Sequence, residues 1–179
     1  MISPRYTTFA IALHWLMALL ILSSFGLGLV MVDLTLSPTK LRLFSWHKWA
    51  GVTIFSLALI RCLWRLSHTS PPLPANLPRW QHAVTEVSHY SLYALMIVIP
   101  LSGWLMSSAK GFQTVYFGVI PLPDLLDKNK ELGETLTLVH KFLNYTMIGI
   151  VIAHAAAALK HHFVDKDDIL RRMLSSAPK

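Results

Sequence analysis

The chain has 179 residues, of which 54% are hydrophobic and 14% are charged, and its formal net charge is +7. A soluble domain typically carries about a quarter charged residues, so this composition excludes an ordinary soluble domain and indicates a membrane protein. The positive charge lies in flanks and connections, without a basic-aromatic face or a known reader motif, which argues against nucleic-acid binding. The single cysteine, Cys62, excludes an internal disulfide and a cysteine-based metal cluster.

Four apolar segments follow one another along the chain, and each predicts a membrane-spanning helix. The charge-free stretch of the first is longer than the apolar core of a cleaved signal peptide, and the third and fourth also come close to the roughly 20 residues that a span needs. The second keeps a shorter charge-free centre, from Trp49 to Ile60, so its flanking basic side chains have to extend to the two interfaces. The predicted helices cover residues 8–32, 43–66, 82–109 and 138–163. We therefore expect an all-α integral membrane four-helix bundle that forms a single domain over residues 1–179.

The Lys and Arg residues indicate how this bundle is oriented. Nine of the 16 lie at the N-terminus, in the connection between the second and third helices and in the C-terminal tail, and seven lie in the other two connections. The connection between the third and fourth helices also holds four of the nine acidic residues. By the positive-inside rule, both termini are predicted to be cytoplasmic. The same connection, residues 111–134, is a longer outer loop that could hold a short amphipathic helix on the membrane surface.

Histidines recur at two depths of the predicted bundle. In the fourth helix, His140 and His154 are 14 residues apart, which is roughly 21 Å along the axis and nearly four turns, so both face the same way. His14 in the first helix matches the depth of His154, and His47 in the second matches the depth of His140. The sequence therefore predicts two facing histidine pairs, one near each membrane surface. His89 lies at the depth of the inner pair as well.

Paired imidazoles at two depths are typical of haem iron, which takes one axial ligand on each side. Zinc would usually recruit three or four ligands, with carboxylates or thiolates among them. A lone intramembrane histidine serves about as often to form a hydrogen bond between helices as to bind a ligand. The pattern over several helices favours two haems that form an electron path through the bilayer.

Small residues would leave room for a flat porphyrin beside these histidines. Gly28 and Gly103 fall at the depth of the outer pair, and Gly51 follows His47 by one turn. The alternative is that these glycines only allow close helix packing. Arg61 lies at the inner depth and is a candidate partner for an anionic haem propionate, or else it extends to the interface.

The stretches that carry the histidines are IALHWLMALL, WHKWAG, SHYSLYALMIVIPLSGW and VHKFLNYTMIGIVIAHAAAALKHHF, and the tail reads DKDDILRRML. Over almost the whole chain, they resemble the bacterial cytochrome b561 family of four-helix, di-haem membrane cytochromes. The resemblance implies a bacterial inner-membrane protein with two haem b groups. His14 and His154 would bind the inner haem, and His47 and His140 the outer one. His89 would then be a pocket residue and not a ligand.

Within this family, the chain is most similar to members that oxidise superoxide at the outer face and reduce ubiquinone at the inner face. The resemblance implies a superoxide:quinone oxidoreductase whose partners are the lipid bilayer, ubiquinone, and superoxide or another periplasmic electron donor. A quinone being reduced needs protons, and histidine titrates near neutral pH. His89 and His161 are therefore candidate quinone contacts, and Trp15 and Ser88 would line the same pocket.

Two other functions stay open on the sequence. The first is a cytochrome b anchor subunit that relays electrons between quinol and a separate redox partner, with the same histidines and a different donor. The second belongs to another class: a metal-transporting or structural four-helix protein that uses the histidines without haem. A visible spectrum of the purified protein separates this second alternative from every redox function.

Overall fold

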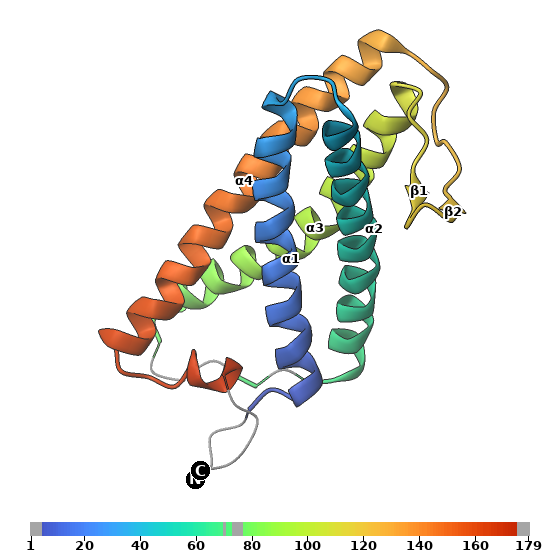
Figure 1. Ribbon diagram of the computed structural model, residues 1–179. Coiled ribbons are helices and arrows are strands. Elements are labelled where there is room, and N and C mark those ends of the chain that lie inside the picture. The colour runs from blue at the N-terminus through green and yellow to red at the C-terminus, as the bar shows by residue number, and fades with distance from the viewer. Residues whose placement is uncertain (1–4, 70, 73–76, 175–179) are drawn as a thin grey trace.

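The computed structural model describes residues 5–69, 71–72 and 77–174. Within these ranges, four long helices, a two-stranded hairpin and a short C-terminal 3-10 helix follow one another along the chain (Figure 1). The elements are α1 (Thr8–Asp33), α2 (Pro38–Ser67), α3 (Arg79–Ala109), β1 (Val115–Tyr116), β2 (Ile120–Pro121), α4 (Lys130–Phe163) and η1 (Arg171–Met173). The all-α four-helix bundle expected from the sequence is confirmed.

Helices α2 and α4 begin earlier than hydropathy predicts, at Pro38 and not residue 43, and at Lys130 and not residue 138. The side chains of Ser37 and Asn129 cap the two starts, because each accepts a hydrogen bond from a backbone N–H of the first turn. Proline in the first turn and a Ser or Asn cap are ordinary helix-start signals. Hydropathy therefore indicates where the lipid-facing part of each helix begins, whereas the caps determine where the helix itself begins.

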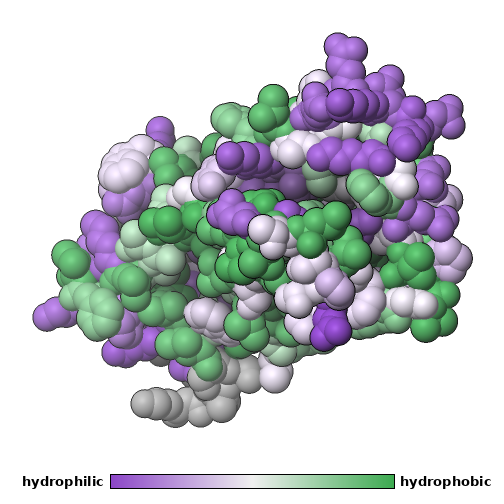
Figure 2. All heavy atoms as spheres, turned by 45° about the horizontal axis from the view of Figure 1, so that its top comes forward, coloured by the Kyte–Doolittle hydropathy of each residue, from purple (hydrophilic) through white to green (hydrophobic). Residues whose placement is uncertain are grey.

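Each of α1 to α4 is long and apolar enough to cross a membrane. Only 6% of the apolar window of α4 and 28% of that of α3 are buried inside the bundle. Leu19, Phe142 and Ile152 are 63%, 70% and 63% exposed. Figure 2 shows broad hydrophobic areas in green on the surface. A surface of this kind needs an apolar covering, which the lipid of a bilayer provides in an integral membrane protein.

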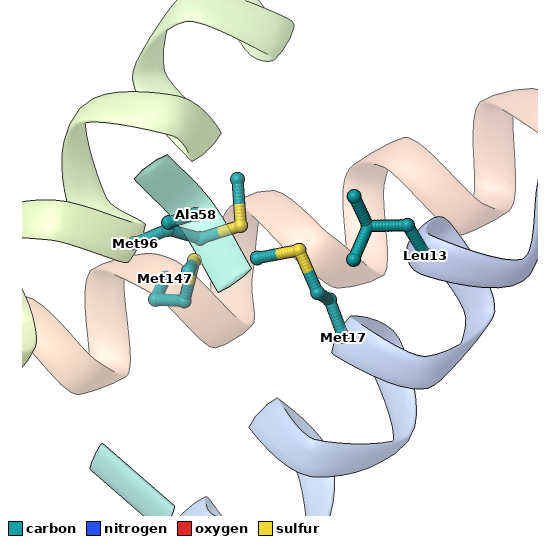
Figure 3. Close-up of a cluster of buried hydrophobic side chains, with 5 residues drawn as sticks. All are labelled: Leu13, Met17, Ala58, Met96 and Met147. Carbon is teal, nitrogen blue, oxygen red and sulfur yellow. The ribbon is translucent and has the colours of Figure 1, made fainter. Parts of the chain in front are cut away.

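The helices pack in chain order: α1 against α2, α2 against α3, and α3 against α4. A small buried cluster joins all four at the centre, and Figure 3 shows its methionine side chains converging from three helices. Its members are Leu13, Met17, Ala58, Met96 and Met147. Flexible thioether side chains fill irregular gaps between helices. Because Met147 is midway between His140 and His154 on α4, the methionines of this cluster lie between the two depths at which the histidines occur, whereas Leu13 lies at the inner depth beside His14.

The connection between α3 and α4, which the structure describes in full, contains a β-hairpin. The hypothesis of a short amphipathic helix in this connection is therefore wrong. Strands β1 and β2 pair antiparallel, and Phe117 and Gly118 turn the chain with φ angles of 50° and 73°. A proline in β2 and a glycine in the left-handed region both disfavour a continuous helix.

Replacing Met147 tests the central packing. Met147 is 4% exposed, so Met147→Ala is expected to lower the free energy of unfolding by about 2–5 kcal/mol, because a cavity remains. Ile152→Ala on the same helix removes a side chain that is 63% exposed and is expected to change stability by only about 0.5 kcal/mol. Unfolding in detergent followed by circular dichroism measures both. Equal losses in the two variants would contradict the central role of this cluster.

Candidate functional site

His47 on α2 and His140 on α4 face each other near the outer end of the bundle, which we define as the end where α1 ends and α4 begins. Their ring centroids are 6.3 Å apart. Nδ1 of His47 lies 3.0 Å from the carbonyl oxygen of Ser24, and Nδ1 of His140 lies 3.1 Å from that of Ile99. A carbonyl oxygen only accepts, so each Nδ1 carries the proton. Each Nε2 is therefore left with a free lone pair, as a metal ligand requires.

Two buried serines strengthen this arrangement. The hydroxyl oxygen of Ser24 lies 3.2 Å from Nδ1 of His47, and that of Ser102 lies 2.8 Å from Nδ1 of His140. Ser102 also donates to the carbonyl of Ile99 at 2.7 Å. These contacts fix the rotation of both rings. The sequence analysis missed both serines, although a polar residue inside a charge-free span is itself an indication of a site.

Two of the three predicted glycines lie against the outer histidine rings. A Cβ atom added at Gly28 would lie 3.4 Å from Cε1 of His47, and one added at Gly103 would lie 3.0 Å from Cε1 of His140. At Gly51 an added Cβ would meet no atom within 4 Å. Gly28 and Gly103 therefore make room for the imidazoles themselves, whereas Gly51 borders open space.

His14 on α1 and His154 on α4 form the second pair, near the inner end, where α1 begins and α4 ends. Their ring centroids are also 6.3 Å apart. His89 on α3 lies 5.4 Å from His154, so three imidazoles meet at this depth. Nη2 of Arg61 is 3.4 Å from Nδ1 of His14. Because a guanidinium has only donors, Nδ1 of His14 accepts here, in contrast to the outer rings.

Arg61 borders a cavity with strong positive charge. Its Nε donates to the hydroxyl of Tyr93 at 3.0 Å, and its Nη1 donates to the carbonyl of Ala10 at 3.3 Å. Arg5 and Arg65 line the same cavity. Three guanidinium groups around one cavity fit an anionic group, such as a carboxylate.

The structure brings two of the four residues predicted for quinone contact to the inner pair. Trp15 lies edge-on to His14, with centroids 5.2 Å apart, and its indole N–H donates to the carbonyl of Met173 at 2.7 Å. His89 lies against His154, as described above. Ser88 precedes His89 on α3 and is half-buried. The contact between Trp15 and Met173 also ties the C-terminal segment to α1.

The fourth residue, His161, has acidic partners in the tail. Its Nδ1 lies 2.8 Å from a carboxylate oxygen of Asp167 and 3.1 Å from one of Asp165. The hydrogen bond from Lys160 lowers the pKa of the Asp165 carboxyl, which keeps that group ionised beside the imidazole. Carboxylates only accept, so Nδ1 of His161 carries the proton. The sequence analysis missed these two aspartates; the acidic residues directly after the histidine pair were the available signal.

Comparison with known proteins decides the family. The chain matches the family model of prokaryotic cytochrome b561 over residues 5–176. It belongs to the prokaryotic cytochrome b561 family. It is 34% identical to cytochrome b561 homolog 2 of Escherichia coli (strain K12), over 97% of this chain and 93% of that protein. It is 30% identical to a probable superoxide oxidase CybB of Yersinia pestis, over 95% and 96%, and 29% identical to cytochrome b561 homolog 1 of Escherichia coli (strain K12), over 77% and 78%.

This cytochrome b561 is therefore a multi-pass membrane protein of electron transfer, and family membership implies that it binds haem b. The geometry fits that group. A ring nitrogen lies roughly 2 Å from a metal that it ligates and the ring centroid about 1 Å further back, so two rings on opposite sides of one ion have centroids roughly 6 Å apart. Both pairs, at 6.3 Å, have this separation. Membership also favours a redox function over a metal transporter or scaffold.

Gly103→Ala tests how tightly the outer pair is enclosed. The new methyl group would lie 3.0 Å from His140, and overpacking of this kind typically costs about 1–3 kcal/mol. We expect lower thermal stability and less haem per chain in a pyridine haemochrome assay. Gly149→Ala on α4 is the control, because its added Cβ meets nothing within 4 Å. Unchanged haem content in the Gly103 variant would show that the ring has space to move.

Proposed function

We propose that this cytochrome b561 is a di-haem enzyme of the bacterial inner membrane that oxidises superoxide at its outer face and reduces ubiquinone near its inner face. Both termini would be cytoplasmic, as the Lys and Arg distribution favours. The observation that carries the proposal is the presence of two facing imidazole pairs, each 6.3 Å between centroids, at opposite ends of one bundle. The similarity to the probable superoxide oxidase of Yersinia pestis supports the choice of electron donor.

His47 and His140 would hold one haem, and His14 and His154 the other. Bound at these places, haem supplies a one-electron carrier at each end of the bundle. The outer rings are prepared for ligation, since their Nδ1 atoms are committed to carbonyls. At the inner pair, an anionic propionate would form an ion pair with the guanidinium of Arg61. Arg61 would then no longer donate to Nδ1 of His14, so that nitrogen could carry a proton.

At the outer end, basic side chains would attract superoxide, which gives up one electron and leaves as dioxygen. Nζ of Lys48 donates to the carbonyl of Phe112 at 2.8 Å, and Nζ of Lys40 donates to that of Leu34 at 2.5 Å. These bonds to carbonyl groups position the two ammonium groups. The candidate steering residues are Lys40, Arg42, Lys48, Lys110 and Lys141.

At the inner end, ubiquinone would take up two electrons and two protons to become ubiquinol. His161 is the proposed proton donor. Its Nδ1–H is held by the carboxylates of Asp165 and Asp167, and these two negative charges would stabilise the doubly protonated ring, whose Nε2–H is the proton given to a quinone oxygen. Trp15 and His89, with Ser88 beside them, would line the rest of the pocket. Asp167 acts here as a positioning residue, because it orients the ring.

Single alanine variants test the haem ligands. His47→Ala and His140→Ala are each expected to lose the outer haem and keep the inner one, so that haem per chain falls about twofold. His14→Ala and His154→Ala are expected to lose the inner haem. A pyridine haemochrome assay gives the amount, and a redox titration shows which haem remains. His82→Ala, outside both pairs, should keep the full amount; two haems per chain in both outer variants would make the assignment wrong.

A steady-state assay tests the reaction. The purified chain, given enzymatically generated superoxide and a soluble ubiquinone analogue, is expected to form one quinol for every two superoxide ions consumed. His161→Gln is expected to slow quinol formation about 100-fold while superoxide still reduces haem. His162→Gln is the matched control and should keep the full rate. A strict need for a second protein would instead favour the anchor-subunit function.

A further inference from the structure

The hairpin between α3 and α4 lies against a membrane-spanning part of α2. The indole N–H of Trp49 donates to the carbonyl of Val115 at 2.7 Å. The hydroxyl oxygens of Thr53 and Tyr116 are 2.9 Å apart. Figure 1 shows the two strands beside α2, on the side away from α1. The hairpin therefore folds back along the wall of the bundle and does not project from its end.

These contacts place the hairpin at a known depth. Thr53 follows His47 by six residues, which is about 9 Å further towards the inner end. Trp49 and Thr53 both belong to the charge-free centre of α2, from Trp49 to Ile60. Because charged residues at the bilayer centre are costly, this charge-free segment has to occupy the hydrocarbon region. Lys48, one residue above, donates to the carbonyl of Phe112 at 2.8 Å and marks the headgroup level.

The exposed side chains of the hairpin have the chemistry of a lipid-facing surface. Phe117, Val119 and Ile120 are 60%, 77% and 56% exposed. No charged residue occurs between Lys110 and Asp124. A contiguous apolar patch of this kind is unfavourable in water. From the depth of Trp49 to that of Thr53, the surrounding medium changes from the headgroup boundary to the acyl region of the outer leaflet.

The backbone of the hairpin is hydrogen-bonded internally at its turn, which reduces the number of unpaired polar groups that it brings to lipid. The N–H groups of Gly118 and Val119 donate to carbonyls of β1 at 3.2 and 3.1 Å, which closes the turn. The N–H of Leu122 donates to the carbonyl of Thr114 at 2.8 Å. These bonds pair three backbone N–H groups of the hairpin within the hairpin itself, although the segment lies outside the helices.

The tip of the turn is an aromatic residue in an unusual conformation. Phe117 has a φ of 50°, which is uncommon for a bulky residue. Its ring lies 5.2 Å from that of Trp49. Trp and Tyr concentrate at membrane interfaces, and the apolar ring of Phe117 lies against one of them, Trp49, with its own exposed face apolar. Insertion of the hairpin into lipid would give this exposed ring a favourable environment.

We propose that the β1–β2 hairpin is inserted into the outer leaflet of the membrane, where lipid acyl chains cover Phe117, Val119 and Ile120. The outer end of the bundle is thus held in the bilayer by this re-entrant hairpin as well as by its helices. The proposal is independent of the electron donor and of the quinone.

Spin labelling of the full-length protein in phospholipid nanodiscs tests it. On a Cys62→Ser background, nitroxides are attached to Val119→Cys and Ile120→Cys, and their collision rates with oxygen and with a water-soluble nickel chelate are measured. Ile152→Cys on α4 is the lipid-facing control, and Asp127→Cys in the same connection is the aqueous control. We expect both hairpin positions to resemble Ile152, with a high oxygen rate and a low nickel rate.

Two results would overturn the proposal. A high nickel rate at Val119 and Ile120, like that at Asp127, would place the hairpin in water. Low rates with both reagents would mean that protein covers the hairpin, as in contact with a second copy of the chain. Only variants with an unaltered haem spectrum are compared, and Val115→Cys provides a further position if one label prevents folding.

Discussion

A ring nitrogen inside a lipid-embedded bundle needs a hydrogen-bond partner, and at the outer end that partner is a helix carbonyl. The rings come from α2 and α4, as His47 and His140, and the carbonyls come from α1 and α3, at Ser24 and Ile99. All four helices must therefore keep one relative register for the site to exist. The close approach of Gly103 to His140 belongs to the same constraint, because a larger residue would push the ring off its carbonyl.

The sequence predicts the four spans and the two histidine pairs because both follow from periodicity along single helices. The partners of the rings could not be predicted, since every residue has a carbonyl and only packing decides which one meets Nδ1. The aspartates beside His161 were missed for a related reason: the chain reverses after α4 and brings Asp165 and Asp167 back to it. The hairpin was mistaken for a helix because hydropathy does not distinguish the two in a short apolar segment.

The two ends of the bundle differ in electrostatics. The outer imidazoles are surrounded by neutral serine and carbonyl groups, whereas Arg61 lies 3.4 Å from His14, and Arg5 and Arg65 share its cavity. Nearby positive charge stabilises the reduced state of a redox centre, because reduction adds an electron. At the inner pair, Arg61 would act in this sense until a propionate pairs with it, and the basic side chains at the outer end would act in the same sense there.

The methionine cluster between the two depths has a consequence for charge movement. Leu13, Met17, Ala58, Met96 and Met147 hold no group that can carry a proton. Electrons can tunnel through such side chains, whereas these five side chains offer protons no relay. An electron that passes from the outer end to the inner end therefore moves net negative charge across part of the bilayer. A full crossing against 100 mV, negative inside, costs about 2.3 kcal/mol per electron, so the turnover of this cytochrome would be electrogenic and sensitive to the energised state of its membrane.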